Sequence, residues 1–128
     1  PNSMTEAASA SLDAIARDPH EWLYAAVLRE PDGQPIDQSI WTLAPHRELA
    51  LADPVVEVEE AGDGWLHVSS PAYCHAVHVE DHGHELLSDN WFDLLPGVPV
   101  RVRRADCDPS VQLRLEAFTT RYGASQAR

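Results

Sequence analysis

The sequence is poor in cysteine, which limits the covalent and redox chemistry it can carry. Only two cysteines, Cys74 and Cys107, occur in 128 residues. Two cysteines set no disulfide framework, and one bridge between them is the most that could form. We interpret them as isolated small apolar side chains, with that single bridge as the alternative.

Positive charge is also scarce. Nine basic residues stand against 21 acidic ones, which gives a formal net charge of −12. Such a surface repels phosphate backbones, and the arginines are scattered rather than striped, so we expect no nucleic-acid partner. No apolar run approaches the ~20 residues that a bilayer-spanning helix needs, so we expect no membrane partner. The N-terminus lacks the regions of a signal peptide, and the compartment is left open.

Motifs for the common enzyme chemistries are missing. We find no G-x-S-x-G nucleophile elbow, P-loop, H-E-x-x-H or C-x-x-C pattern, and we expect no cofactor. The acids that a glycosidase would need in pairs fall mostly in turns or on outward strand faces. Asp93 is the exception because its neighbours are apolar. We expect it to cap backbone N–H groups of the adjoining turn rather than to act in catalysis.

What the sequence does contain is a series of short apolar or alternating runs with turn signals between them. A hairpin is predicted around Pro31-Asp32-Gly33. The runs, at about ten-residue spacing, are WLYAAVL (22–28), IDQSIWTLAP (36–45), VVEVEE (55–60), WLHVSS (65–70), AYCHAVHVE (72–80), VPVRVRR (98–104) and VQLRLEAF (111–118). This pattern predicts an all-β, antiparallel, immunoglobulin-like sandwich of about seven strands, preceded by a β-hairpin. A chain of this length can bury roughly two-thirds of its unfolded surface, so the core needs no disulfide bond or metal ion to be stable.

The N-terminal residues differ from the predicted strands in their amino-acid pattern. Pro1-Asn2-Ser3 before Met4 looks like an expression remnant, which suggests a piece of a longer protein. Residues 5–17 form either a short helix or a mobile lead-in.

Histidines offer the only metal candidates in the sequence. On a regular strand, His75 and His78 point to opposite faces, so one ion cannot easily bind both. His82 and His84 flank a glycine in a turn, where two imidazoles could meet an ion at the surface. A polar hairpin tip is the interpretation we favour there, so no metal site is predicted. His67 is expected on an outward strand face.

Tryptophans could instead form a platform for sugar rings. Trp22, Trp41 and Trp91 lie among apolar neighbours and are predicted to be core residues. Trp65 follows a glycine turn and is the tryptophan most exposed by this reasoning. It is therefore the one candidate sugar contact, although a core position is the interpretation we favour for Trp65 as well.

The stretch SDNWFDLLPG, residues 88–97, is the most distinctive in the chain. Turn-forming residues stand at both ends, with apolar residues between them. It comprises Ser88, Asp89, Asn90, Trp91, Phe92, Asp93, Leu94, Leu95, Pro96 and Gly97. This segment resembles a signature near the end of β-mannosidases and related exo-acting enzymes of glycoside hydrolase family 2, in their last immunoglobulin-like domain. Upstream, WTLAPHRELALADPVVEVEE (41–60) is similar to the junction into that domain, with His46 a small departure.

The resemblance implies a domain division and a role. Residues 20–53 would be a hairpin and linker from the end of the preceding immunoglobulin-like domain, and 54–118 the C-terminal sandwich. Residues 1–19 would be a lead-in and 119–128 a flexible tail. Residues 88–97 would form a bent crossover between strands, pinned to the core by its aromatics. The catalytic glutamates of such enzymes lie in a separate (β/α)₈ barrel of about 250 residues, which this chain cannot contain.

We therefore expect a non-catalytic accessory domain of an exo-β-mannosidase that removes terminal β-mannose with retention. Its partners would be the barrel and the neighbouring immunoglobulin-like domain of the same parent chain. The alternative is a carbohydrate-binding module that holds mannosides through Trp65 and nearby polar residues. We also expect residues 20–45 to fold back on the sandwich or to pair with another chain through an exposed strand edge.

Overall fold

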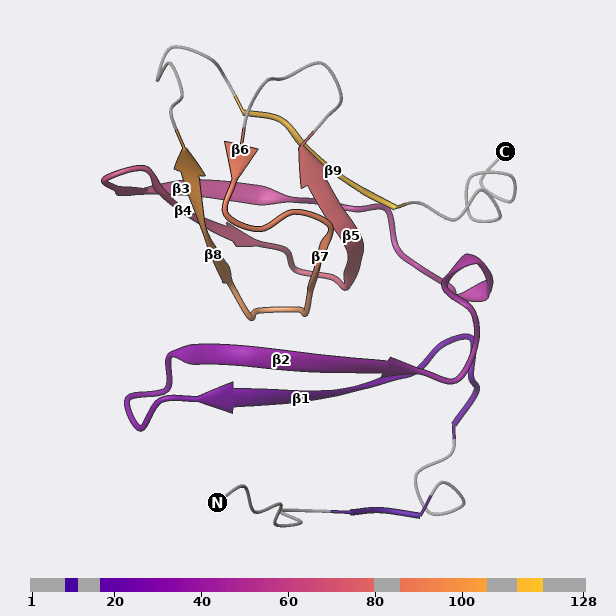
Figure 1. Cartoon of the computed structure of the whole chain (residues 1–128). Helices are drawn as coiled ribbons and strands as arrows, with labels where there is room; N and C mark the ends of the chain where they lie inside the picture. The colour runs from indigo at the N-terminus through magenta and orange to yellow at the C-terminus, as the bar shows by residue number, and fades with distance from the viewer. Residues whose placement is uncertain (1–8, 12–16, 80–85, 106–112, 119–128) are drawn as a thin grey trace, which may run out of the picture.

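The computed structural model describes residues 9–11, 17–79, 86–105 and 113–118 (Figure 1). In these ranges the chain is all β, apart from a single 3₁₀ turn. The elements are β1 (Leu23–Arg29), β2 (Pro35–Thr42), η1 (His46–Glu48), β3 (Glu57–Gly62), β4 (Trp65–Ser69), β5 (Cys74–Val79), β6 (Leu86–Leu87), β7 (Phe92–Leu94), β8 (Val100–Ala105) and β9 (Leu115–Phe118). Within the described ranges, no helix has the length and apolar character to span a membrane. Residues 5–17, expected to be either a short helix or a mobile lead-in, lie mostly outside them.

Seven strands form two antiparallel sheets packed face to face. One sheet has the order β3-β4-β8-β6 and the other the order β7-β5-β9. The core lies between them and draws on both. It consists of Leu66, Val68 and Val102 from the first sheet, and Cys74, Val77 and Leu94 from the second. The predicted immunoglobulin-like sandwich is confirmed.

Alternating sequence correctly predicts the strands at the centre of the first sheet. Leu66 and Val68 of β4 are buried, while His67 between them is exposed, as expected. On β8, Val102 is buried between the exposed Arg101 and Arg103. A side chain of this size contributes about 1.5–3 kcal/mol when it leaves water, so these inward positions hold the sheets together.

The edge strand β3 departs from the prediction. It begins at Glu57 rather than at residue 55, and all its residues are exposed, Val58 included. β3 pairs with β4 alone and packs on the core only through Val56, just before it. The alternation of apolar and acidic residues in β3 therefore does not produce a buried face.

A β-bulge in β5 overturns the predicted alternation of 72–80. Between the pairs Cys74–Leu94 and Val77–Phe92, two residues of β5 lie opposite one residue of β7, and Ala76 has φ +53°. The extra residue brings Cys74 and Val77 to the same, inner face, where both are buried. Cys74 is a free thiol in the core, so its apolar interpretation is confirmed, while Cys107 lies outside the described residues.

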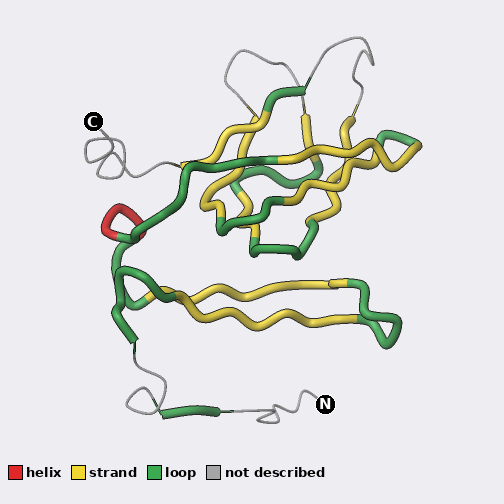
Figure 2. The backbone as a smooth tube through the Cα atoms, turned by 180° about the vertical axis from the view of Figure 1, so that it is seen from behind, coloured by secondary structure: helices red, strands yellow, loops and turns green. Residues whose placement is uncertain are grey.

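The hairpin β1–β2 forms a second layer beside the sandwich, seen from both sides (Figure 1, Figure 2). The predicted turn is present: Gly33 has φ +92° and donates its N–H to the Glu30 carbonyl at 2.8 Å. Asp32 accepts from the Gln34 N–H at 3.0 Å. The hairpin meets the sandwich near β7, where the candidate site lies.

Candidate functional site

Residues 88–97, the signature segment, begin as a capped turn fastened to β8. The Ser88 N–H donates to the Arg103 carbonyl at 2.7 Å, and its hydroxyl accepts from the Arg103 N–H at 2.8 Å. Asp89 accepts from the Asn90 N–H at 2.9 Å, and Asn90 accepts from the Trp91 N–H at 3.2 Å. The oxygens of these short polar side chains accept hydrogen bonds from backbone N–H groups that have no backbone acceptor in the turn.

The second half of the segment is anchored by its leucines. Leu94 and Leu95 are buried, and Pro96-Gly97 turns the chain so that the Val98 N–H donates to the Leu95 carbonyl at 3.1 Å. Gly97 has φ +69°, which a residue without a Cβ adopts at little cost. The prediction that both aromatics pin the loop is wrong for Trp91, which is exposed.

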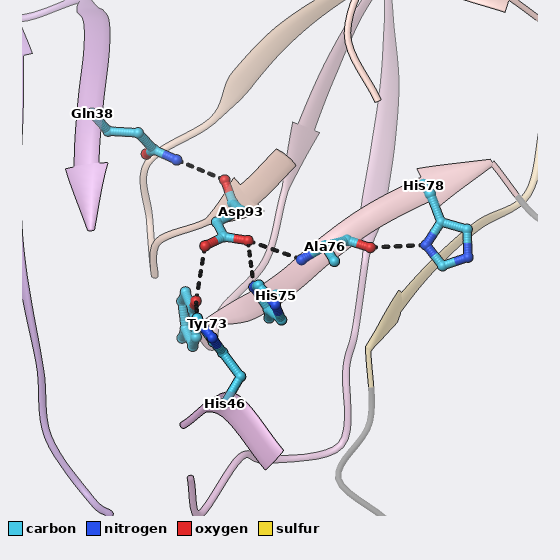
Figure 3. A network of polar contacts seen from close by, with 7 residues as sticks. All are labelled: Gln38, His46, Tyr73, His75, Ala76, His78 and Asp93. Atoms are coloured by element: carbon cyan, nitrogen blue, oxygen red, sulfur yellow. Dashed lines mark hydrogen bonds and ion pairs between the residues drawn. The ribbon is translucent and has the colours of Figure 1, made fainter. Parts of the chain in front are cut away.

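Asp93 lies at the centre of a polar network (Figure 3). One carboxylate oxygen accepts from the Ala76 N–H at 2.9 Å and from His75 Nδ1 at 2.8 Å. The other oxygen accepts from the Tyr73 hydroxyl at 2.9 Å. We call this group, with His46, the Asp93 clamp. Asp93 does accept a backbone N–H, but at the β5 bulge rather than in the adjoining turn, so that prediction is corrected in location.

The direction of each hydrogen bond follows from Asp93, which as a carboxylate only accepts. Burial and the hydrogen bond to Asp93 raise the pKa of Tyr73 far above its usual range, so the phenol keeps its proton and donates it to Asp93. The Tyr73 oxygen is then left to accept from His46 Nε2 at 3.2 Å. Asp93 therefore selects the protonated nitrogen in both imidazoles, Nδ1 in His75 and Nε2 in His46.

The clamp joins three separate parts of the chain. His46 comes from η1 in the linker, and its ring stacks on His75 with centroids 3.6 Å apart and planes 9° apart. From the hairpin, Gln38 Nε2 donates to the Asp93 carbonyl at 2.6 Å. The sandwich supplies Tyr73 and Asp93. The hairpin thus binds Asp93 directly, and the linker reaches it through Tyr73 and His75.

Three residues of the clamp also carry side chains that can bind a metal ion. Donor atoms of His46, His75 and Asp93 lie within 4.8 Å of one another, the one such group in the described ranges. An ion bound by imidazole lies close to the ring plane, about 2.0–2.1 Å from the nitrogen. Two nearly parallel, stacked rings share no such point, and the Asp93 oxygens already accept three donors. The arrangement fits a hydrogen-bonded clamp. His82 and His84 lie outside the described residues.

Three of the four tryptophans are more exposed than predicted. Trp22, Trp41 and Trp91, expected in the core, are exposed, whereas Trp65, for which a core position was favoured over a sugar platform, is partly buried. The Arg101 guanidinium lies 4.1 Å from the centroid of the Trp65 ring. That cation–π contact covers part of the ring face that a sugar would need. Trp22 and Trp41 stay exposed because they lie in or directly before the strands of a two-stranded hairpin, and Trp91 because it lies in the exposed turn before β7.

Acid is expected to weaken the clamp through His46. Burial, and the nearby charge of His75, lower the pKa of His46 below its usual value of 6.5, with Asp93 offsetting part of this. The unfolded chain therefore binds the extra proton first, so the free energy of unfolding falls as pH drops from about 6.5 through the lowered folded pKa. Tm measured from about pH 8 to about pH 5 should fall more steeply for the wild type than for His46→Gln.

His67→Gln is the matched control for this experiment, because His67 is exposed on β4 and belongs to no part of the clamp. Its Tm profile should follow that of the wild type. Parallel profiles for the wild type and His46→Gln would contradict the role given to His46.

Comparison with known families agrees with this architecture. The family model Ig_mannosidase, described as an Ig-fold domain, matches residues 51–121, more than half of the chain. The chain belongs to this family of Ig-fold domains, which is found in β-mannosidase-type proteins. A search of curated proteins finds no match. The matched region holds all seven strands of the sandwich and the signature segment, whereas the hairpin precedes it.

Proposed function

We propose that this chain is the C-terminal accessory domain of an exo-β-mannosidase of glycoside hydrolase family 2, and carries no catalysis itself. The observation that carries this proposal is the family match over residues 51–121. The signature segment supports it, because its leucines fill the core and its aspartate holds the clamp. The parent enzyme would remove terminal β-mannose with retention, using glutamates of its barrel.

Within the parent, the clamp gives the domain a mechanical role. We propose that residues 20–53 are the last hairpin and the linker of a preceding immunoglobulin-like domain, with residues 54–118 the accessory sandwich. Gln38 on the hairpin and His46 on the linker both bind the Asp93 clamp. The clamp would then fix the angle between the two domains, so that the sandwich supports the barrel in one orientation.

The test compares the isolated chain with the protein encoded by its complete reading frame. The chain alone should not hydrolyse 4-nitrophenyl β-D-mannopyranoside above the buffer rate. The complete protein should contain an additional barrel of about 250 residues and hydrolyse this substrate faster than the β-galactoside and β-glucuronide analogues. A frame without a barrel, or activity that copurifies with the isolated chain, would overturn the proposal. Preference for another glycoside would retain the accessory role and correct the substrate.

A further inference from the structure

A groove lies between the hairpin and the sandwich, next to the signature segment. Its volume is about 610 Å³, within the range of roughly 300–1,000 Å³ typical of small-molecule sites. Its lining includes Asp37 and Gln38 on the hairpin side, and Asp89, Trp91, Asp93 and Arg101 on the sandwich side. The groove thus combines one large aromatic ring with several polar groups.

Trp91 is held in this groove in an unusual way. Its side chain is 63% exposed, yet its ring stacks on His78 with centroids 3.9 Å apart and planes 13° apart. Its backbone has φ +65°, a conformation that is costly for a bulky residue and that recurs at functional sites. Burial cannot compensate for this cost because the side chain stays exposed. The fold therefore presents a positioned aromatic ring to the solvent.

The polar groups around Trp91 suit a neutral, hydroxyl-rich ligand. Asp37 and Asp89 are exposed, and each uses one carboxylate oxygen to accept a backbone N–H, at 2.8 and 2.9 Å. The second oxygen of each can accept from a hydroxyl, while the Arg101 guanidinium can donate to one. The acidic residues, on a chain with net charge −12, disfavour anionic ligands such as uronic acids.

We propose that this groove is a carbohydrate-binding site for a short β-mannoside, with a pyranose ring packed on Trp91. Hydroxyls of the sugar donate to Asp37 and Asp89. The chemistry of the groove carries the assignment to a neutral sugar, whereas the choice of mannose rests on the proposed function. The site differs from the Trp65 platform expected from sequence, and it needs the hairpin as well as the sandwich.

The experiment is a titration of the ¹⁵N-labelled chain with β-1,4-mannobiose, followed by the indole and backbone N–H signals. We expect saturable shifts at Trp91 and Asp89, with a Kd in the millimolar range. Trp91→Ala should weaken binding by about tenfold or more, and Trp91→Phe by less. Trp41→Ala is the matched control, because Trp41 is 61% exposed, close to the 63% of Trp91, but does not line the groove.

Each outcome decides the proposal. Dispersed amide spectra of both alanine variants establish that they fold, so a loss confined to Trp91→Ala supports the site. No saturable shift, shifts centred on Trp65, or equal losses in both variants would overturn it. None of these results bears on hydrolysis by the complete protein, so the accessory function is judged separately. Equal affinity for cellobiose would retain a sugar site but overturn the assignment to mannose.

Discussion

Replacing Leu94 with alanine should destabilise the chain more than any other single truncation described here. Leu94 is fully buried, with 0% of its side chain exposed, and packs in the core that both sheets share. Leu→Ala changes at such sites cost about 2–5 kcal/mol, because the apolar contact is lost and a cavity remains. Domains of this kind are stable by only about 5–15 kcal/mol, so a large share of the stability should disappear.

Urea unfolding followed by tryptophan fluorescence measures this loss. The matched control is Leu28→Ala, which removes the same atoms from a side chain that is 61% exposed on β1. That variant should lie within about 0.5 kcal/mol of the wild type. Similar losses in the two leucine variants would mean that the signature segment does not contribute its leucine to the core.

Removing the carboxylate of Asp93 should be the next largest effect. Asp93→Ala leaves the Ala76 N–H, His75 Nδ1 and the Tyr73 hydroxyl without their acceptor. Each unsatisfied buried group costs about 1–3 kcal/mol. The Asp93 side chain is 21% exposed, so water replaces part of what is lost. We expect about 2–4 kcal/mol in total.

The conservative variant Asp93→Asn distinguishes loss of the carboxylate's hydrogen bonds from loss of the whole side chain. Asp93→Asn keeps an oxygen for the Ala76 N–H but presents an amide N–H to Tyr73, whose hydroxyl can rotate to accept it. It should cost about 1 kcal/mol. Hydrogen exchange at the Ala76 amide should quicken in Asp93→Ala and stay protected in Asp93→Asn. The control Glu59→Ala, on the exposed strand β3, should change neither quantity.

The sandwich could be predicted from sequence because burial follows alternation wherever two sheets face each other. β4 and β8 pair in the middle of their sheet, and their apolar residues point into the core as a period of two requires. The same rule misleads for β3, an edge strand. It also fails in β5, where one inserted residue changes the face of every position after it.

The clamp could not be predicted in the same way, because its members are far apart in sequence. Asp93 gave a signal, as an acid among apolar residues, but nothing identified its partners. His46 lies 47 positions away in the linker, and Tyr73 approaches only because β5 pairs with β7. For the tryptophans, apolar neighbours along the chain were mistaken for neighbours in space. Trp91 is followed along the chain by the buried Leu94 and Leu95 and is itself exposed.

The bulge at Ala76 also limits how this family member can change during evolution. Cys74 and Val77 both reach the core, and the Ala76 N–H reaches Asp93, only because one extra residue lies between the paired positions. Substitutions along β5 alter single contacts. A one-residue deletion there would instead turn Val77 outward and leave Asp93 without its backbone donor. The hairpin turn at Gly33 has no such constraint, so insertions should accumulate there while the length of β5 stays fixed.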